Sequence, residues 1–414
     1  MRRGVRSKPG GALSLRLLAM TEAHQRFSAV TGRFFRSHSP GDALSSNRGA
    51  ESLSKVPQPS SATDQRNRLS QIDFLRGLAA LSVCWYHFTT ANSFAGEGAL
   101  RNSGTYGWLG VEIFFVISGF IIPYSLYRAG YRLGDYPTFI LKRVTRLDPP
   151  YLASIVLVLL LSYLTAMRTH RAFHIDVSGL LLHIAYLNTF FGHPWLNDVF
   201  WTLSIEFQYY LLVGLLFPLF SSSARLVRLF SFAFFGLLSF TIQRTFELPE
   251  QTWIFPYVLL FFQGLATFQY VVGIIKRPEY ILLVVVFSSA CLVSLGAPYA
   301  IAGLLSVGVI NLLKVRSPIF SFLGAISYSV YLLHMPIGDR ALFLIGRRFL
   351  VDQKLLATVL AVGVTICSAY LFYRFIERPA QRWSSVFRYR AQAHQAEPKK
   401  QSETAAPSPG ISPP

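Results

Sequence analysis

The feature that most constrains this chain is a series of long apolar segments between about residues 70 and 385. Most are long enough to cross the roughly 30 Å hydrocarbon core of a bilayer as a helix. Only 14% of the 414 residues are charged and 52% are hydrophobic, so a soluble fold would leave large apolar patches in water. The sequence therefore predicts an all-α protein, a bundle of about ten transmembrane helices. The expected spans are residues 72–92, 107–127, 150–167, 200–220, 229–243, 253–273, 279–296, 297–313, 319–343 and 355–375.

The two ends of the chain differ in composition from this core. Residues 1–69 are rich in Ser, Arg, Gly and Pro, and residues 386–414 are polar and Pro-rich. Segments of this kind cannot bury a core, so we expect two disordered extensions on either side of a membrane domain of residues 70–385. The basic, acid-poor N-terminal segment also fits an organellar targeting peptide, and Met20 is an alternative start.

The formal net charge of +19 reflects 39 Lys and Arg against 20 Asp and Glu. The basic residues form short clusters between apolar segments and accompany no nucleic-acid motif, so we expect no nucleic-acid partner. If residues 177–191 do not cross, six clusters fall on one side, which the positive-inside rule makes cytoplasmic together with both termini. Residues 177–191 could instead form an eleventh span or a re-entrant segment. On the ten-span topology Arg347, Arg348 and Lys354 lie outside, against the rule.

The cysteines and two of the glycines in the apolar segments are interpreted as packing residues. Cys84, Cys291 and Cys367 lack the spacing of a metal site or a disulfide framework, and we expect no metal. Gly110 and Gly119 are expected to let helices approach closely. No phosphate-binding loop or dinucleotide fingerprint is present in the sequence.

The segment "RGLAALSVCWYH" places Arg76 and His87 eleven residues apart. This spacing turns a helix about 20° past three full turns and raises it ~16 Å, so both side chains share one face. A histidine can act as general base for a hydroxyl group, and an arginine offers a planar fork for phosphate or carboxylate. The alternative is an interfacial arginine and a histidine that is satisfied by a neighbouring helix.

Two carboxylates fall inside apolar segments near their outer ends. Glu112 lies in "GWLGVEIFFVISGF" and Glu206 in "WTLSIEFQYY". Either could orient the His87 imidazole, and either could instead pair with a cation for structural reasons. Trp201 and Ser204 join Glu206 in a polar and aromatic cluster, although a tryptophan at this depth also fits the interfacial belt of membrane proteins.

Two further motifs carry candidate binding residues. Arg143 and Arg146 are three residues apart, so a helix would turn both toward one ligand, for which the phosphates of a cytoplasmic cofactor are suited. Plain orientation by positive charge is the alternative. The stretch "GAISYSVYLLHMP" brings Tyr328 and His334 into one span, where they either meet a substrate or join helices to one another.

Together these motifs resemble the acyltransferase type 3 family of integral membrane acyltransferases. The resemblance covers about residues 70–385, and Thr202 stands where the family's third motif usually has serine. The matching stretches, in chain order, are "DFLRGLAALSVCWYHF" (73–88) for the Arg-x10-His hallmark, "GVEIFFVISGF" (110–120), "RVTRLDP" (143–149), "WTLSIE" (201–206), "LGAISYSVYLLHMP" (323–336) and "FIERPAQRW" (375–383).

The resemblance implies a ten-helix core that transfers an acyl group, commonly acetyl from acetyl-CoA, to a hydroxyl. It implies acyl-CoA as co-substrate and no metal cofactor. The implied partners are membrane lipids and a glycan or glycolipid acceptor, and the implied location is a bacterial inner membrane. Oligomeric state is not predicted. A transporter or exporter of a small polar or acylated substrate is the alternative function, because polar residues within spans would also suit a substrate pathway.

Placement of the candidate residues along the spans suggests a division of labour. We expect His87 to deprotonate the acceptor hydroxyl, with Glu112 or Glu206 orienting its ring. Direct transfer needs no covalent intermediate, but a two-step route through an acylated residue stays open. The residues expected to hold the phosphates of acyl-CoA are Arg76, Arg143 and Arg146, and those expected to bind substrate are Trp201, Ser204, Tyr328 and His334.

Overall fold

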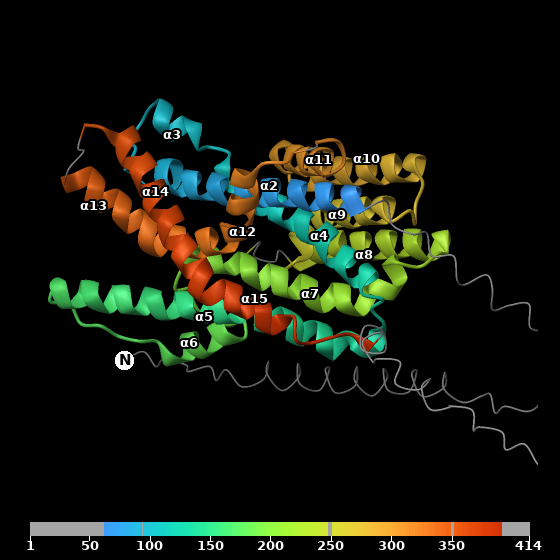
Figure 1. Cartoon of the computed structure of the whole chain (residues 1–414), viewed down its shortest axis with the longest axis horizontal. Helices are drawn as coiled ribbons and strands as arrows, with labels where there is room; N and C mark the ends of the chain where they lie inside the picture. Colours follow the sequence, from blue (N-terminus) through green and yellow to red (C-terminus); the bar gives the residue numbers. More distant parts are fainter. Residues whose placement is uncertain (1–61, 93, 247–250, 314, 349–351, 391–414) are drawn as a thin grey trace, which may run out of the picture. The chain divides into compact units, whose positions relative to one another are not determined.

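The fold is described from a computed structural model, which covers residues 62–92, 94–246, 251–313, 315–348 and 352–390. Within these residues every regular element is helical (Figure 1). The helices are α2 (Ala62–Tyr86), α3 (Ala99–Ser103), α4 (Gly110–Arg128), α5 (Tyr136–Arg168), α6 (Val177–Ile184), α7 (Trp201–Phe220), α8 (Arg225–Phe246), α9 (Val258–Val271), α10 (Arg277–Ser294), α11 (Ala297–Leu312), α12 (Pro318–Leu333), α13 (Arg340–Arg348), α14 (Lys354–Phe372) and α15 (Arg378–Ser384).

Seven helical segments of the described chain are long and apolar enough to cross a membrane. Each overlaps one of the expected spans, so the predicted all-α membrane class is confirmed. Two shorter apolar helices, at residues 255–271 and 297–312, overlap two more of the expected spans. The seven long segments are Ala99–Arg128, Leu133–Arg168, Asp198–Phe220, Arg225–Phe246, Arg277–Ser294, Pro318–Arg348 and Lys354–Ser384.

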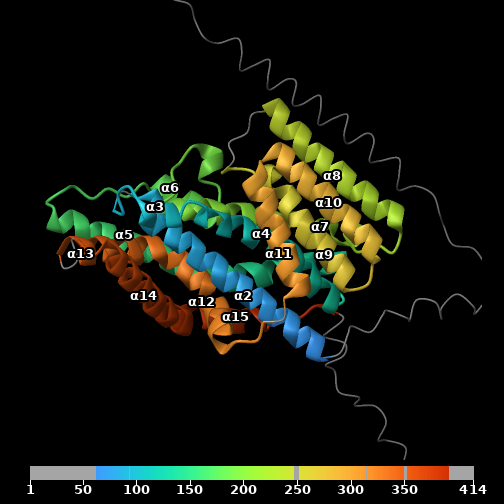
Figure 2. The ribbon, with the colours of Figure 1, turned by 90° about the horizontal axis from the view of Figure 1, so that it is seen from above.

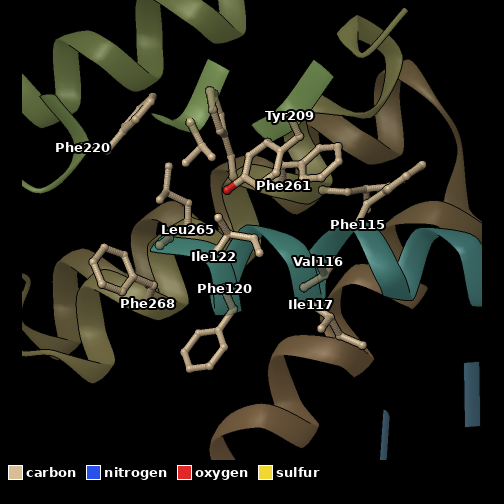
Figure 3. Close-up of a cluster of buried hydrophobic side chains, with 14 of the residues drawn as sticks. Phe115, Val116, Ile117, Phe120, Ile122, Tyr209, Phe220, Phe261, Leu265 and Phe268 are labelled. Atoms are coloured by element: carbon tan, nitrogen blue, oxygen red, sulfur yellow. The ribbon is translucent and has the colours of Figure 1, made fainter. Parts of the chain in front are cut away.

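Close glycine contacts hold α4 against its neighbours, as predicted for Gly110 and Gly119. A Cβ atom on Gly119 would lie 2.2 Å from the main-chain oxygen of Phe261 in α9, and one on Gly110 would lie 2.3 Å from that of Ala79 in α2. Phe115 and Phe261 pack against each other near this contact, with ring centres 5.0 Å apart (Figure 3). The centre of the bundle is therefore built on main-chain contact between α4 and α9, surrounded by aromatic rings.

A second close contact joins α2 to α12, which lie side by side in both views (Figure 2). A Cβ atom on Gly77 would lie 2.8 Å from Cβ of Leu323, and one on Gly324 would lie 2.4 Å from the main-chain oxygen of Asp73. Small residues on both helices thus bring their backbones together. The contact places α2, which carries Arg76 and leads into His87, directly beside α12, which leads into His334.

Helix α5 combines a basic segment and an apolar span in one element. It runs for 33 residues and passes through Pro149 and Pro150 without a break. Arg143 and Arg146 therefore belong to the same helix as the span, and α15 packs against it (Figure 1). In contrast, α6 has only eight residues, about 12 Å, so it is too short to cross, as the expected topology requires.

Three helices end in π-helical turns, which are rare and often occur at functional sites. These turns follow α2, α12 and α14 and cover His87–Ala91, His334–Asp339 and Tyr373–Glu377. Each turn contains one ionisable side chain that would be costly to bury inside a membrane without a role, namely His87, His334 and Glu377.

The two expected extensions fall largely outside the described residues. Nothing is described for residues 1–61 and 391–414, whereas α2 already begins at Ala62, within the range given to the N-terminal extension. At the other end, Tyr389 is buried and the main-chain N–H of Arg390 donates to the Asp135 carboxylate at 3.2 Å. Defined contacts therefore continue past the predicted domain boundary at residue 385.

Candidate active site

A cavity of about 620 Å³ lies between α2, α4, α5, α7 and α12. This volume falls in the range of small-molecule sites. Its lining on α4 runs from Val111 to Arg128, which corresponds to about 25 Å along a helix. The cavity is therefore long, and its lining is basic at one end and mostly apolar at the other.

Basic side chains outnumber acidic ones in the lining of this cavity. Five cations face three carboxylates, which leaves an excess of positive charge. Arg76, Arg143 and Arg146, the three residues predicted to bind phosphate, are brought together here. The other charged lining residues are Arg128 and Lys142 among the cations, and Asp73, Glu206 and Glu377 among the acids.

Aromatic rings pack against the guanidinium of Arg143, and no ion pair joins it to another residue that the structure describes. Its guanidinium lies 5.4 Å from the ring centre of Phe139 and 5.6 Å from that of Tyr210. Its buried Nε atom has no hydrogen-bond partner among the described residues. Such cation–π contacts hold the guanidinium in place without engaging its N–H donors, which stay available to a ligand. Since Arg143 and Arg76 both act electrostatically on Arg146, the cluster favours an anion.

Glu377 is a member of this cluster to which the sequence analysis gave no role. Its side chain is 2% exposed and accepts hydrogen bonds from Ser329 Oγ at 2.5 Å and from Gln381 Nε2 at 2.9 Å. It lies within electrostatic reach of Arg76 and Arg146. The signal was present in "FIERPAQRW", where an acid stands next to arginine at the end of an apolar helix, but only the fold shows which cations it faces.

Glu206 lies with the arginines in the cavity. Its Oε1 atom accepts hydrogen bonds from Ser118 Oγ at 2.8 Å and from the Tyr210 hydroxyl. Because the Tyr210 ring also lies 5.6 Å from the guanidinium of Arg143, Glu206 and Arg143 share one neighbour. The role predicted for Glu206, orientation of the His87 ring, stays a prediction, and the hydrogen bonds that the structure shows hold it to other groups.

A hydrogen-bonded pair lies at the end of the cavity that is away from the cations. The hydroxyls of Thr202 and Tyr331 are 2.6 Å apart, and the Tyr331 hydroxyl also lies 3.1 Å from the carbonyl oxygen of Val199. Both side chains line the cavity together with Val111 and Phe114, near the start of α4. The end opposite the cations is thus apolar apart from two engaged hydroxyls.

His87 and His334 lie next to each other beyond this pair and do not line the cavity. Their ring centres are 5.1 Å apart, and the ring of His334 lies 5.7 Å from that of Tyr331. His87 is half-buried and lies within electrostatic reach of the exposed Asp198. Glu112 is buried and acts electrostatically on Tyr331.

The remaining predicted substrate residues are dispersed. Tyr328 lines the cavity and its hydroxyl donates to the carbonyl of Leu147 at 3.1 Å. Ser204 is buried and donates to the carbonyl of Tyr186 at 2.9 Å, which ties α7 to the chain after α6. Trp201 packs against another aromatic ring outside the cavity lining. In the part of the chain that the structure describes, no group of three His, Cys, Asp or Glu side chains could hold a metal ion.

The family model described as an acyltransferase domain, that of acyltransferase type 3, matches residues 69–374. This chain belongs to the acyltransferase type 3 family. The match contains Arg76, His87, Arg143 and Arg146, and it stops just before Glu377. Membership confirms the resemblance inferred from the motifs, and together with the apolar helices it makes the chain an integral membrane protein with an acyltransferase domain.

Two relatives illustrate the similarity. A protein of Acidianus two-tailed virus that is named as an acetyltransferase is 31% identical over 37% of this chain and 42% of its own length. A protein of Komagataeibacter xylinus that is named as a membrane-bound transacylase, BcsY, is 27% identical over 76% of this chain and 83% of its own length. This chain thus spans less than half of the viral relative. No solved structure matches this chain.

Proposed function

We propose that this protein is an O-acyltransferase of a bacterial inner membrane. It transfers an acyl group, of which acetyl is the first candidate, from cytoplasmic acyl-CoA to a hydroxyl of a glycan or glycolipid. The observation that carries the proposal is the cavity that joins Arg76, Arg143 and Arg146 at one end and stops at Tyr331, next to the histidine pair, at the other.

The proposed topology has ten spans with both termini in the cytoplasm. The seven long apolar segments are completed by α2, α9 and α11, which pack against other members of the bundle. The N-terminal end of α2, the C-terminal end of α4 and the N-terminal end of α5 lie on the same side (Figure 1). Basic residues follow α4 and begin α5, which supports a cytoplasmic position for this side.

The basic end of the cavity suits the phosphates of acyl-CoA. Guanidinium groups bind phosphate oxygens through paired, charge-assisted hydrogen bonds. The two aromatic rings beside Arg143 engage none of its N–H donors, which stay available. From this end, the roughly 25 Å of cavity leaves room for an extended pantetheine arm that carries the thioester toward Tyr331.

His87 is the proposed general base. In a direct transfer the acceptor oxygen gives its proton to His87 and attacks the thioester carbonyl carbon, the carbon–sulfur bond breaks, and the proton ends on the thiol of CoA. His87 is half-buried near the outer end of α2, where an acceptor from outside the membrane can reach it. For the thioester to meet that acceptor, the Thr202–Tyr331 pair has to rearrange.

The test uses purified full-length protein in detergent with acetyl-CoA labelled in the acetyl group. Octyl glucoside, a lipid-tailed sugar, and a lipid and glycan extract of bacterial envelopes serve as acceptors. We expect label in the acceptor and release of the CoA thiol with the wild type, and neither with His87→Ala. His183→Ala is the matched control, because His183 is a buried histidine that lies in the segment around α6 and not in the cavity lining.

Three results would contradict the proposal. Transfer by His87→Ala at the wild-type rate would remove the general base. Binding of acetyl-CoA without transfer to any acceptor would remove the reaction. Uptake of label into proteoliposomes without covalent transfer would instead favour the transporter alternative.

A further inference from the structure

His334 has a defined tautomer in this structure. Its Nδ1 atom lies 2.7 Å from the carbonyl oxygen of Tyr331 and 3.3 Å from that of Val330. Carbonyl oxygens only accept hydrogen bonds, so Nδ1 must carry the hydrogen. In the neutral ring Nε2 then holds a lone pair and can act only as an acceptor.

That acceptor has no partner among the described residues, although His334 is 0% exposed. A buried polar atom without a hydrogen bond destabilises the folded state, so such atoms are uncommon unless they have a use. His183 shows the ordinary case in the same chain: its Nδ1 meets Gly179 and Asn188, and its Nε2 accepts from the main-chain N–H of Leu196. His334 differs because only one of its two ring nitrogens is engaged.

The ring beside His334 is that of His87. Two imidazoles joined by a nitrogen–nitrogen hydrogen bond of about 2.9 Å have ring centres roughly 5 Å apart. The observed separation of 5.1 Å therefore already suits one such bond, once the half-buried His87 ring is turned so that one of its nitrogens faces Nε2. Both histidines begin π-helical turns, where helix geometry changes and side chains are redirected.

We propose that His334 is the positioning residue of the His87 base: its Nε2 accepts the N–H of His87, which leaves the lone pair of the other His87 nitrogen for the acceptor hydroxyl. This inference rests on the proposed O-acyltransferase function and deepens it. His334 changes no bond itself. It fixes the His87 tautomer and ring orientation, a role for which the sequence had suggested Glu112 or Glu206. Glu206 is held by Ser118 and Tyr210 instead.

Two amide substitutions separate this role from a purely structural one. His334→Gln places an amide oxygen near the position of Nε2 and so retains the acceptor, but loses the donor at Nδ1. His334→Asn places an amide N–H near Nδ1 and so retains the bond to the Tyr331 carbonyl, but has no acceptor at the Nε2 position. The labelled acetyl-CoA assay with octyl glucoside and envelope extract measures kcat and the KM for acetyl-CoA for both variants.

We expect kcat of His334→Asn to fall by about 10²-fold or more, the usual contribution of a positioned base, with KM for acetyl-CoA nearly unchanged because His334 lies outside the cavity lining. His334→Gln should retain about a tenth or more of the wild-type kcat. His183→Gln serves as control, and should keep its kcat even if its thermal midpoint falls.

The opposite order, with His334→Asn as active as the wild type and His334→Gln inactive, would show that only the bond to Tyr331 matters and would overturn the proposal. Equal activity of both variants and the wild type would overturn it as well. If the wild type transfers no label to any acceptor, the proposed function fails, and this inference fails with it.

Discussion

The hydroxyl of Tyr331 lies 2.6 Å from that of Thr202, and this pair separates the cavity from the two histidines. All the basic lining residues are on one side of it, and His87 is on the other. The arrangement has a consequence for the acyl group. A thioester that reaches Tyr331 from the basic end has little space left for a long chain, so the wild type should favour short acyl groups.

Removing the Tyr331 ring should therefore change acyl-chain selectivity. With Tyr331→Ala, we expect the ratio of kcat/KM for hexanoyl-CoA to that for acetyl-CoA to rise roughly tenfold or more, since each buried methylene contributes about 1 kcal/mol or more. Tyr331→Phe keeps the ring and should keep the acetyl preference while losing about 1 kcal/mol of stability with the hydroxyl. The control is Tyr163→Ala, because Tyr163 is 44% exposed on α5. An unchanged ratio in Tyr331→Ala would place the acyl chain elsewhere.

The paired arginines of α5 give the second prediction. Replacing Arg143 and Arg146 together by alanine should raise the KM for acetyl-CoA by about 10²-fold, because each hydrogen bond to a charged group contributes about 1.5–3 kcal/mol. Isothermal titration with CoA should show the same loss. The matched double variant is Arg347→Ala with Arg348→Ala, which removes two exposed arginines of α13. If both double variants bind CoA like the wild type, the cavity is not its site.

The third prediction concerns Glu377 and its buried hydrogen bonds. Glu377→Ala removes the acceptor of Ser329 and Gln381, and it removes a negative charge that acts on Arg76 and Arg146. Loss of one member of a buried charged cluster destabilises a protein by about 3 kcal/mol or more, so the thermal midpoint in detergent should fall clearly.

Glu377→Gln should lower the thermal midpoint less than Glu377→Ala, because the amide oxygen still accepts from Ser329. Glu97→Gln is the control, because the side chain of Glu97 is 93% exposed and lies 4.0 Å from Arg101. Equal midpoints for Glu377→Ala and the control would show that the cluster is solvated and contributes little.

Helix periodicity explains which parts of the site were predictable. Arg143 and Arg146 share α5, and His87 directly follows α2, the helix of Arg76, so the relative position within each pair follows closely from the geometry of one helix. Depth along a span was also predictable. The rotation of one helix against another was not, because it depends on which small residues bring backbones together.

Glu206 shows the limit of such reasoning. Its position two turns into a span suggested a depth near His87, yet the packing of α7 turns it toward Ser118 and the basic cavity. The partnership of His87 with His334 depends on the contact between α2 and α12, which rests on Gly77 and Gly324. A pattern read along one segment contains no information about such contacts between segments.

The last prediction tests the contact between α4 and α9 that supports the cavity wall. A Cβ atom on Gly119 would lie 2.2 Å from the carbonyl oxygen of Phe261, a main-chain atom that cannot rotate away. Gly119→Ala therefore has to push the two helices apart, and overpacking of this kind destabilises by about 1–3 kcal/mol. Gly308→Ala in α11 is the matched control, because a Cβ atom there meets nothing within 4 Å. That variant should be neutral or more stable by about 0.5–1 kcal/mol, since alanine favours the helix.

The thermal midpoint in detergent should therefore fall for Gly119→Ala and stay unchanged or rise for Gly308→Ala. Because Ser118 and Ile117 line the cavity next to Gly119, the KM for acetyl-CoA should also rise in Gly119→Ala and not in Gly308→Ala. A Gly119→Ala variant with wild-type stability and KM would show that α4 and α9 do not pack this closely.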